Sequence, residues 1–252
     1  MPIFNSVFKS FQRWGKWDAT GATSTSSIWV ANTCRWAFMS DDGYHFYTGL
    51  ESGRAVVQYD LSTPYKLSTA SQVYSLSTDA QNQIWFDETW TYLYTAGVKQ
   101  YTLSTPRQLS TATQTWTLAV NFPQWWCRLC QVIDDTHLWL AWSYNWAWNQ
   151  CMVTLSAPHD LSNVTRVYTT RSSTDRMVRN HDGTIILFSG YWSSVALQQA
   201  TCSTPFDIST MWTATNILTW KKYPYYAYTN RNCWLIFWDE NNTVYYYNLP
   251  NS

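Results

Sequence analysis

Aromatic side chains flanked by amides are the residues of this sequence best suited to bind a ligand. Tyr144, Trp146 and Trp148 lie in one short segment next to asparagines, and Tyr191 and Trp192 lie in a second. Sugar rings offer apolar C–H faces together with hydroxyl groups, so aromatic rings beside amides suit them. The alternative for these rings is packing within or between structural units, because the chain contains 18 tryptophans.

Groups that could perform catalysis do not form a recognisable motif. The four histidines are dispersed along the chain, and no HExxH, GxSxG, Walker or GxGxxG pattern occurs. The acidic pairs at 41–42 and 134–135 occupy equivalent places in a repeat, which favours a role in turns over acid–base chemistry. We therefore predict that the protein is not an enzyme and has no catalytic residues. A glycosidase that takes carboxylates from different repeats stays an alternative.

The cysteines and charges also narrow the range of functions. Cys127 and Cys130 form a CxxC pair, but residues three apart on a strand point to opposite faces, so we predict buried thiols, no metal and no cofactor. With 16 basic and 16 acidic residues the chain has no net charge, and we predict no nucleic-acid partner. No signal peptide is recognised, and no apolar run approaches the roughly 18 residues of a membrane-spanning helix.

The elements that must position these residues are set by an internal repeat. The stretch YDLSTPYKLSTA at 59–70 recurs in altered copies, whose prolines are Pro64, Pro106, Pro158, Pro205 and Pro250. These prolines are separated by 42, 52, 47 and 45 residues, a period typical of propeller blades or solenoid units.

The repeat predicts an all-β fold, a five-bladed β-propeller with four strands in each blade. In the first repeat the strands are expected near residues 36–39, 44–48, 55–59 and 71–76, since aromatic and β-branched residues suit strands. The fifth repeat stops at Pro250 before its own last strand. Residues 21–29 resemble residues 109–116, and residues 22–30 are predicted to supply that strand and close the ring.

The two faces of the predicted propeller carry different loops. Tight turns between the first two strands of each repeat align at Gly43, Trp90, Thr136, Gly183 and Asn232. These turns are expected to share one face with the LSTP stretches, which connect the third strand to the fourth. A long aromatic loop at 143–150 is expected on the opposite face, where loop variation favours ligand binding.

The N-terminal segment reads as a separate element, which divides the chain into residues 1–16 and a propeller at 17–252. Apolar residues that include Phe4, Phe8 and Phe11 recur at spacings of three and four within residues 2–14, which predicts a short amphipathic helix. It could anchor the protein on a partner, lie on a membrane surface, or pack against its own domain.

The repeat resembles the YxLSTPxDLSTA propeller repeats of tailed-bacteriophage and other phage virion proteins. Asp160 and Asp207 keep the aspartate of that motif, whereas Lys66 and Gln108 replace it. The resemblance implies a virion structural protein, such as a tail fibre, spike or receptor-binding subunit, that is made in the host cytoplasm. It further implies partners among other virion proteins in a larger homo- or hetero-oligomeric assembly, and attachment to a host surface glycan or protein. A carbohydrate-binding propeller lectin outside a virion and a polysaccharide hydrolase are the alternatives.

Overall fold

The protein folds as antiparallel β-sheets in the computed structural model. This structure describes residues 23–30, 34–50, 54–78, 84–95, 99–117, 127–144, 147–172, 177–179, 184–189, 196–204, 210, 215–219, 227–229, 234–238 and 243–248. These residues contain strands and short 3₁₀ turns but no α-helix. The predicted N-terminal helix, with Phe4, Phe8 and Phe11, lies outside them.

The described strands form five four-stranded sheets. The first sheet holds β2 (Cys34–Met39), β3 (His45–Leu50), β4 (Ala55–Leu61) and β5 (Ala70–Ser77), and the second holds β6 (Ile84–Phe86), β7 (Tyr92–Thr95), β8 (Lys99–Leu103) and β9 (Ala112–Thr117). The third holds β10 (Cys127–Asp134), β11 (His137–Tyr144), β12 (Ala147–Leu155) and β13 (Val164–Ser172), and the fourth holds β14 (Met177–Arg179), β15 (Ile185–Ser189), β16 (Ala196–Thr201) and β17 (Thr215–Thr219). The fifth holds β18 (Ala227–Thr229), β19 (Trp234–Trp238), β20 (Thr243–Asn248) and β1 (Thr23–Trp29).

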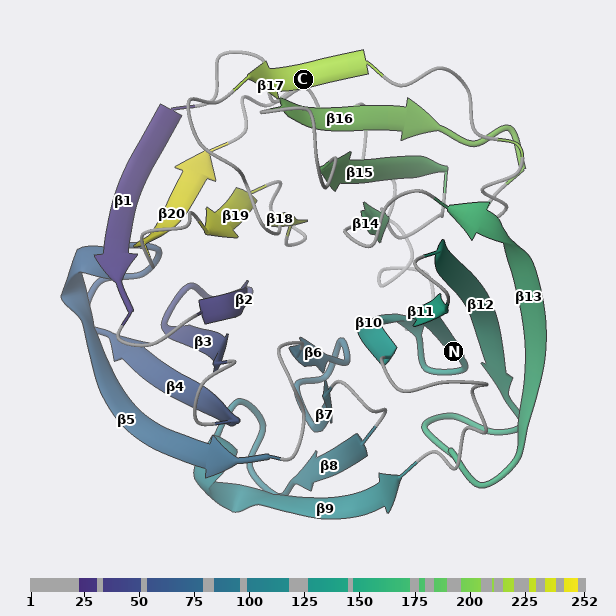
Figure 1. Cartoon of the computed structure of the whole chain (residues 1–252). Helices are drawn as coiled ribbons and strands as arrows, with labels where there is room; N and C mark the ends of the chain where they lie inside the picture. Colours follow the sequence, from purple (N-terminus) through teal and green to yellow (C-terminus); the bar gives the residue numbers. More distant parts are fainter. Residues whose placement is uncertain are drawn as a thin grey trace, which may run out of the picture.

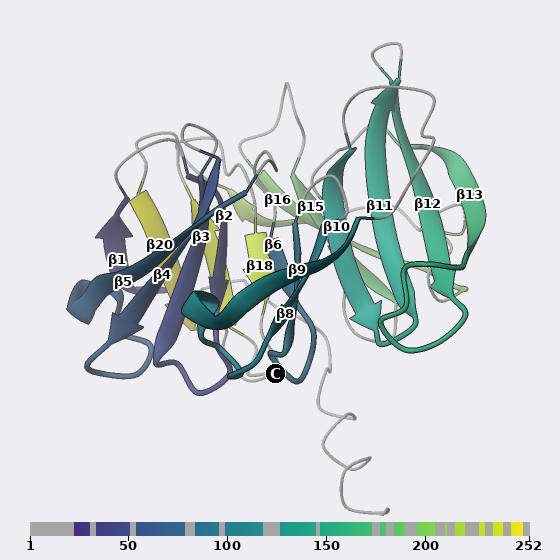
Figure 2. The ribbon, with the colours of Figure 1, turned by 90° about the horizontal axis from the view of Figure 1, so that it is seen from below.

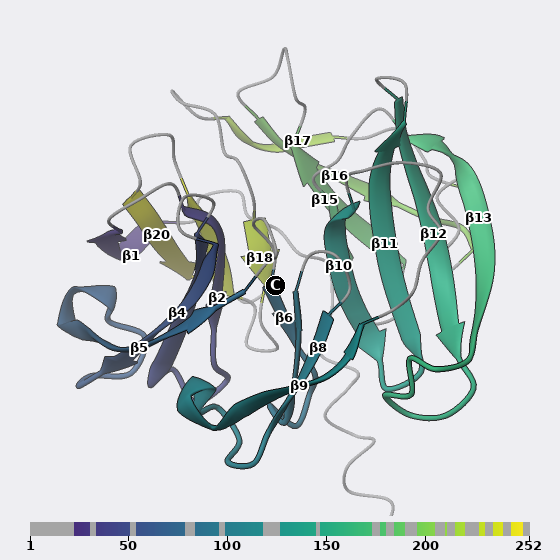
Figure 3. The same ribbon diagram turned by 60° about the horizontal axis from the view of Figure 1, so that its bottom comes forward.

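The sheets stand around a common centre (Figure 1). The first strand of each sheet, such as β2, β6 and β10, lies toward the centre, and the last, such as β5, β9 and β13, lies at the periphery (Figures 1 and 3). The outer strand of the fifth sheet is β1, which pairs antiparallel with β20 from Thr23 opposite Asn248 to Trp29 opposite Thr243. The first described strand of the chain thus completes the sheet that holds the last three.

The core consists of apolar side chains between neighbouring sheets. Phe38 of the first sheet packs edge-on against Trp85 of the second at 5.4 Å between ring centroids, and Tyr47 lies 4.5 Å from Phe86. In β11 the successive residues Leu138, Trp139 and Leu140 are all buried, which means that both faces of this strand are covered. This explains apolar strands that do not alternate with polar residues. The outer strands β5 and β9 differ, because most of their residues are exposed.

Each LSTP stretch forms the connection from the third strand of a sheet to the fourth. We call residues 61–70, 103–112 and 155–164 the first, second and third connections. The residue after the proline has a positive φ in all three: 61° at Tyr65, 69° at Arg107 and 57° at His159. Backbone bonds such as Lys66 N to Thr63 O at 3.2 Å close a turn with proline at its second position, and the positive φ at its third position is that of a type II turn.

Other residues of the repeat stabilise this turn. The Thr69 and Thr111 hydroxyls accept hydrogen bonds from the backbone N–H of Thr63 and Thr105, at 3.2 and 3.1 Å. Each of the first two connections contains a 3₁₀ turn, Leu67–Thr69 in the first and Leu109–Thr111 in the second. The leucine of each turn is completely buried. The threonine, proline and leucine of the repeat are therefore structural residues of the connection.

Turns and connections lie at the same end of the sheets, which confirms the prediction that they share a face. The backbone N–H of Tyr65, Arg107 and His159 donates to the carbonyl of Gly43, Trp90 and Asp135, respectively. The aligned turn position of the third repeat is therefore Asp135, and the prediction of Thr136 is wrong. The register of β10 against β11 shifts between Val132 and Asp134, so this strand contains an irregularity that sequence spacing does not reveal.

The long aromatic loop predicted at 143–150 is largely strand, so that prediction is wrong. Ser143 pairs with Trp148, and Tyr144 pairs with Ala147. Aromatic residues favour strands, and here they lengthen the hairpin of β11 and β12. Figure 2 shows this hairpin extending away from the end that carries the connections.

Candidate functional site

The described connections each dock on the preceding sheet around the ring. We call the contact between the first sheet and the second connection the first junction, and the contact between the second sheet and the third connection the second junction. The first connection docks in the same way on β1, where the Ser26 hydroxyl accepts a bond from Leu67 N at 3.1 Å and donates to Tyr65 O at 3.2 Å. The repeat therefore joins neighbouring sheets as well as neighbouring strands.

Charged and polar groups fill the first junction. The buried Gln58 amide accepts a hydrogen bond from Leu109 N at 2.8 Å and donates to Asp60 at 2.9 Å. The same Asp60 carboxylate lies 2.8 Å from His45 Nδ1. Arg107 reaches back to the turn of the first sheet, where its guanidinium lies 2.8 Å from the Asp41 carboxylate. The connection is thus held by ion pairs as well as by backbone contacts.

The Arg107 contact also affects the ionisation of the turn. Partial burial would raise the pKa of Asp42, but hydrogen bonds from Ser40 and the Tyr44 amide, together with the Arg107 charge, hold that pKa below its ordinary value. The neighbouring carboxylates outweigh desolvation at Arg107 in the same way and raise its pKa. Asp42 is therefore ionised throughout the neutral range.

The second junction has an aromatic stack and a histidine–carboxylate contact where the first has the Arg107 ion pair. The His159 imidazole lies flat on the Tyr92 ring, with 4.0 Å between centroids and 15° between planes. Its Nδ1 lies 3.0 Å from the Tyr94 hydroxyl, and its Nε2 lies 3.3 Å from the Asp135 carboxylate. A neutral imidazole with its proton on Nε2 satisfies both contacts, because Nδ1 then accepts from Tyr94. The stack fixes one wall of the junction.

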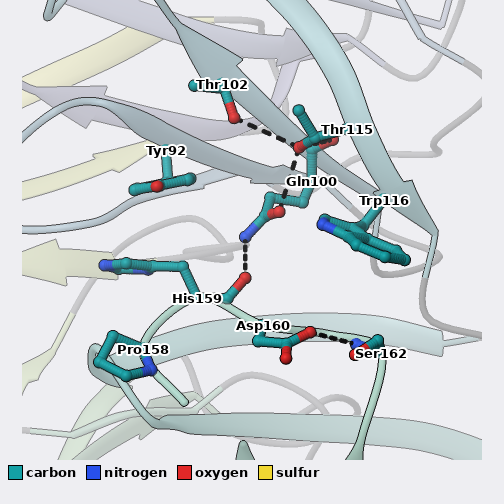
Figure 4. Close-up of a pocket in the computed structure, with 9 residues that line it drawn as sticks. All are labelled: Tyr92, Gln100, Thr102, Thr115, Trp116, Pro158, His159, Asp160 and Ser162. Atoms are coloured by element: carbon teal, nitrogen blue, oxygen red, sulfur yellow. Dashed lines mark hydrogen bonds between the residues drawn. The ribbon is translucent and has the colours of Figure 1, made fainter.

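A cavity of about 350 Å³ lies beside this stack (Figure 4). Its lining comes from strands of the second sheet and from the third connection: Tyr92, Gln100, Thr102, Thr115, Trp116, Pro158, His159, Asp160 and Ser162. In the view of Figure 4 the Tyr92 and His159 rings lie on one side of the Gln100 amide, and the Trp116 indole lies on the other. This cavity is the candidate functional site.

The Gln100 amide is committed to the fold. Its Nε2 donates to the Tyr94 hydroxyl at 2.9 Å and to the His159 carbonyl at 2.8 Å, which uses both amide hydrogens. Its Oε1 accepts from the Thr115 hydroxyl at 3.1 Å, and Thr115 accepts in turn from Thr102 at 3.3 Å. Gln100 is also 1% exposed, so it supports the floor of the cavity and has no hydrogen left for a ligand.

The groups that remain for a ligand include two hydrogen-bond acceptors, Thr102 and Asp160, besides the Tyr92 hydroxyl and the Trp116 indole N–H. Thr102 keeps its oxygen lone pairs after it donates to Thr115. Asp160 Oδ1 accepts from Ser162 N at 2.8 Å, and bonds from the Ser162 side chain and backbone lower the pKa of this exposed carboxyl. Asp160 is therefore ionised at neutral pH, with acceptor capacity left over. No lysine or arginine is among the lining residues.

Trp116 supplies an apolar surface next to these acceptors. It belongs to the outer strand β9 and is 45% exposed, although a ring of this size is usually covered. It pairs with Gln100 across the strands, so its position is fixed relative to the committed amide. An exposed ring beside acceptors in a small recess can bind an uncharged polar molecule that has an apolar face.

The sequence-predicted ligand residues are only partly placed by the structure. Tyr144 ends β11 and Trp148 lies in β12, one pair apart along the same hairpin. Trp146, Tyr191 and Trp192 lie outside the described residues. The structure therefore brings Tyr144 and Trp148 onto adjoining strands and gives no arrangement for the predicted set as a whole.

Sequence reasoning missed the cavity because it assigned the connections a structural role alone. The available signal was a difference between copies: the third connection has Asp160, and the fourth copy has Asp207, where the first two have Lys66 and Gln108. A second signal was Trp116, a large ring in an outer strand that otherwise reads as Ala, Thr and Gln.

The buried thiols agree with the prediction where they are described. Cys34 and Cys202 are buried and form no disulfide, and burial raises the pKa of Cys34 to about 12. Within the described residues no group of three or more His, Cys, Asp or Glu side chains could hold a metal ion. The same part of the structure contains no helix long and apolar enough to cross a membrane.

Comparison with known proteins identifies the fold class. No family model matches the sequence, and no curated protein matches it. The structure is similar to the WD40 β-propeller domain of Doa1, with a TM-score of 0.52 and 11% identity over 91% of this chain and 97% of that one. It is also similar to a luciferin-regenerating enzyme, with a TM-score of 0.53 and 8% identity over 87% of this chain and 73% of that one.

The fold is therefore that of a β-propeller. A functionally unknown protein from Desulfotomaculum acetoxidans is matched over 84% of this chain and 65% of its own length, with a TM-score of 0.45 and 9% identity. At these identities the likeness concerns the fold alone.

Proposed function

We propose that the chain is a bacteriophage virion structural protein, a tail fibre, spike or receptor-binding subunit, that attaches to a host surface glycan or protein. In this proposal the five sheets are the blades of a five-bladed propeller that β1 closes. Residues 1–16 anchor the propeller to other virion proteins, and the propeller faces outward to the host. The phage assignment rests on the resemblance of the LSTP repeats.

The observation that supports attachment is the cavity at the second junction. It sets an exposed tryptophan beside free acceptors on a backbone that two sheets hold rigidly. A rigid scaffold with one side-chain arrangement that departs from its repeats is typical of a binding site. The hairpin that carries Tyr144 and Trp148, with Trp146, Tyr191 and Trp192, is a second proposed contact region.

The two alternative functions receive less support. A propeller lectin outside a virion would use the same cavity, and only the anchoring role of residues 1–16 separates it from the virion protein. A polysaccharide hydrolase needs a pair of carboxylates about 5–10 Å apart around the bond to be cleaved. Asp160 is the only carboxylate among the residues that line the described cavity.

Deleting residues 2–14 tests the proposed function. We expect phage particles produced with the shortened chain to lack the protein and to lose adsorption to host cells. The purified shortened chain should keep the cooperative unfolding transition of the full chain, because the repeats begin after this segment. Particles that still incorporate the shortened chain would contradict the anchor. Particles that lose the chain and adsorb normally would contradict the attachment role.

A further inference from the structure

We propose that the cavity at the second junction is a subsite for one non-anionic pyranose ring, which stacks on Trp116 and donates hydrogen bonds to Asp160 and Thr102. The inference deepens the proposed attachment function and rests on it for its biological meaning. The binding chemistry itself follows from the cavity alone.

The size and surface of the cavity fit a single sugar ring. Its volume of about 350 Å³ is at the small end of the roughly 300–1,000 Å³ typical of ligand pockets, which leaves room for one sugar ring. The C–H face of a pyranose is apolar and flat enough to cover an indole, and Trp116 is exposed beside the cavity. A ring stacked there leaves its hydroxyl groups at the edge, toward the polar lining residues.

The hydrogen-bonding capacity of the lining determines the ligand class. Gln100 has no hydrogen to give, and Thr115 and Thr102 donate to Gln100 and Thr115, respectively. The acceptors that remain are the oxygen of Thr102 and the carboxylate of Asp160, and the Tyr92 hydroxyl and the Trp116 indole N–H are donors in the same lining. A ligand that uses both acceptors must bring donors of its own, which the hydroxyl groups of a neutral pyranose or the ammonium group of an amino sugar supply.

The charge of the lining excludes an anionic ligand. Asp160 is ionised at neutral pH, and no lysine or arginine lines the cavity to compensate a carboxylate, sulfate or phosphate on the ligand. The nearby His159 already has both ring nitrogens in contact with Tyr94 and Asp135. Uronic acids and phosphorylated sugars are expected to be repelled.

The first junction offers a matched control within the same chain. Tyr74 occupies the place of Trp116, since it pairs with Gln58 as Trp116 pairs with Gln100, and it is 37% exposed. The place of Thr102 is taken by Asp60, whose carboxylate is already engaged by His45 and Gln58. Removing the Tyr74 ring therefore tests for nonspecific loss of an exposed aromatic side chain.

The test is a titration of the purified full chain with glucose, galactose, glucosamine and glucuronate. Ligand-observed NMR measures the binding of each sugar. We expect binding of at least one uncharged or amino sugar, with glucuronate about tenfold weaker or worse. Trp116→Ala should weaken binding about tenfold or more, Trp116→Phe should restore part of it, and Tyr74→Ala should leave it unchanged. Asp160→Asn should weaken the amino sugar most and reduce the discrimination against glucuronate.

Separate outcomes distinguish this subsite from the proposed function. If no sugar binds, or if Trp116→Ala binds as the wild type does while the unfolding transition is unchanged, the subsite is wrong. Particles that carry Trp116→Ala and adsorb normally, although the purified variant no longer binds sugar, would support the subsite and contradict its part in attachment. Loss of adsorption in Trp148→Ala particles with sugar binding intact would place attachment at the hairpin.

Discussion

The first and second junctions use the same strand positions but differ in the chemistry of their side chains. At the first, Asp60 pairs with His45 and Arg107 pairs with Asp41. At the second, the places of His45, Asp60 and Arg107 are taken by Tyr92, Thr102 and His159, which form a ring stack, a threonine hydrogen bond and a contact with the Asp135 carboxylate. The repeat supplies a common backbone, and side chains at a few aligned positions decide which contacts each junction makes.

The aligned buried glutamines, Gln58 and Gln100, show how few side chains distinguish the hydrogen bonding of the two junctions. In the first junction Gln58 accepts from the backbone N–H of Leu109, while the Tyr47 hydroxyl donates to the Arg107 carbonyl at 2.7 Å. In the second junction the Tyr94 hydroxyl contacts the imidazole of His159 and not the backbone of the connection. The His159 carbonyl accepts a hydrogen bond from Gln100 instead. One side chain in the connection thus reorganises the partners of two buried groups.

The largest expected effect is on the free energy of unfolding, at the buried leucine that the connections of both junctions contain. Leu109 is 0% exposed and Leu161 is 3% exposed, so Leu109→Ala and Leu161→Ala should each lower the free energy of unfolding by about 2–5 kcal/mol through lost burial and a cavity. Urea denaturation measures this change. Val73→Ala, at a residue 49% exposed, is the control and should change stability by less than about 0.5 kcal/mol. A small effect at Leu161 alone would show that the third connection is not seated as the second is.

A glycine at the turn of the first sheet gives a second contrast. Gly43 has a φ of 76°, and a Cβ added there would lie 2.7 Å from the Tyr65 ring. The aligned residue of the next sheet is Trp90, which has a φ of 63°, so a side chain is tolerated in this backbone conformation where no tyrosine ring covers it. The contact with Tyr65, more than the positive φ, is what requires glycine at this position.

Gly43→Ala is therefore expected to cost about 1–3 kcal/mol, from steric overlap and a strained backbone. In a Tyr65→Ala background the same substitution should cost clearly less, because the ring it strikes is gone. Thermal or urea unfolding of the wild type, both single variants and the double variant gives the coupling between the two positions. Equal costs in both backgrounds would assign the requirement to the backbone alone.

The sequence predicted the parts of the fold that repeat. The spacing of the prolines indicated the β-propeller fold, and strands expected at 36–39 and 55–59 lie within β2 and β4. The turn alignment was wrong at Thr136, because His159 N bonds to the carbonyl of Asp135, and the same repeat contains a register shift in β10. Spacing between motifs cannot show where within a repeat an extra residue is absorbed.

The candidate site could not be predicted from any single segment. Trp116 and Asp160 are 44 residues apart in the sequence and meet only because the third connection docks on the second sheet. The positive φ that directs His159 toward Tyr92 occurs at a residue type that does not indicate it. The sequence signals were the difference between the aligned positions Lys66, Gln108 and Asp160 and the presence of Trp116, and their meaning depends on the three-dimensional contact.

The smallest expected effect is the response of the first junction to acid. The pKa of Asp42 is lowered in the folded chain, so its contribution to stability is fully present above the unfolded-state pKa of about 3.9 and is lost as the pH falls through the lower folded-state pKa. The side chain is partly exposed, so solvent limits this contribution to roughly 1 kcal/mol or less.

A carboxyl NMR titration gives the Asp42 pKa directly, and urea unfolding at neutral pH and near pH 3 gives its effect on stability. The wild type should lose more stability over this interval than Asp42→Asn, because the variant has no carboxylate to protonate at this position. Sugar binding at the second junction should be the same in both proteins at neutral pH, since Asp42 and Arg107 belong to the first junction. Equal acid sensitivity of the wild type and Asp42→Asn would show that the Asp42 carboxylate does not stabilise the first junction.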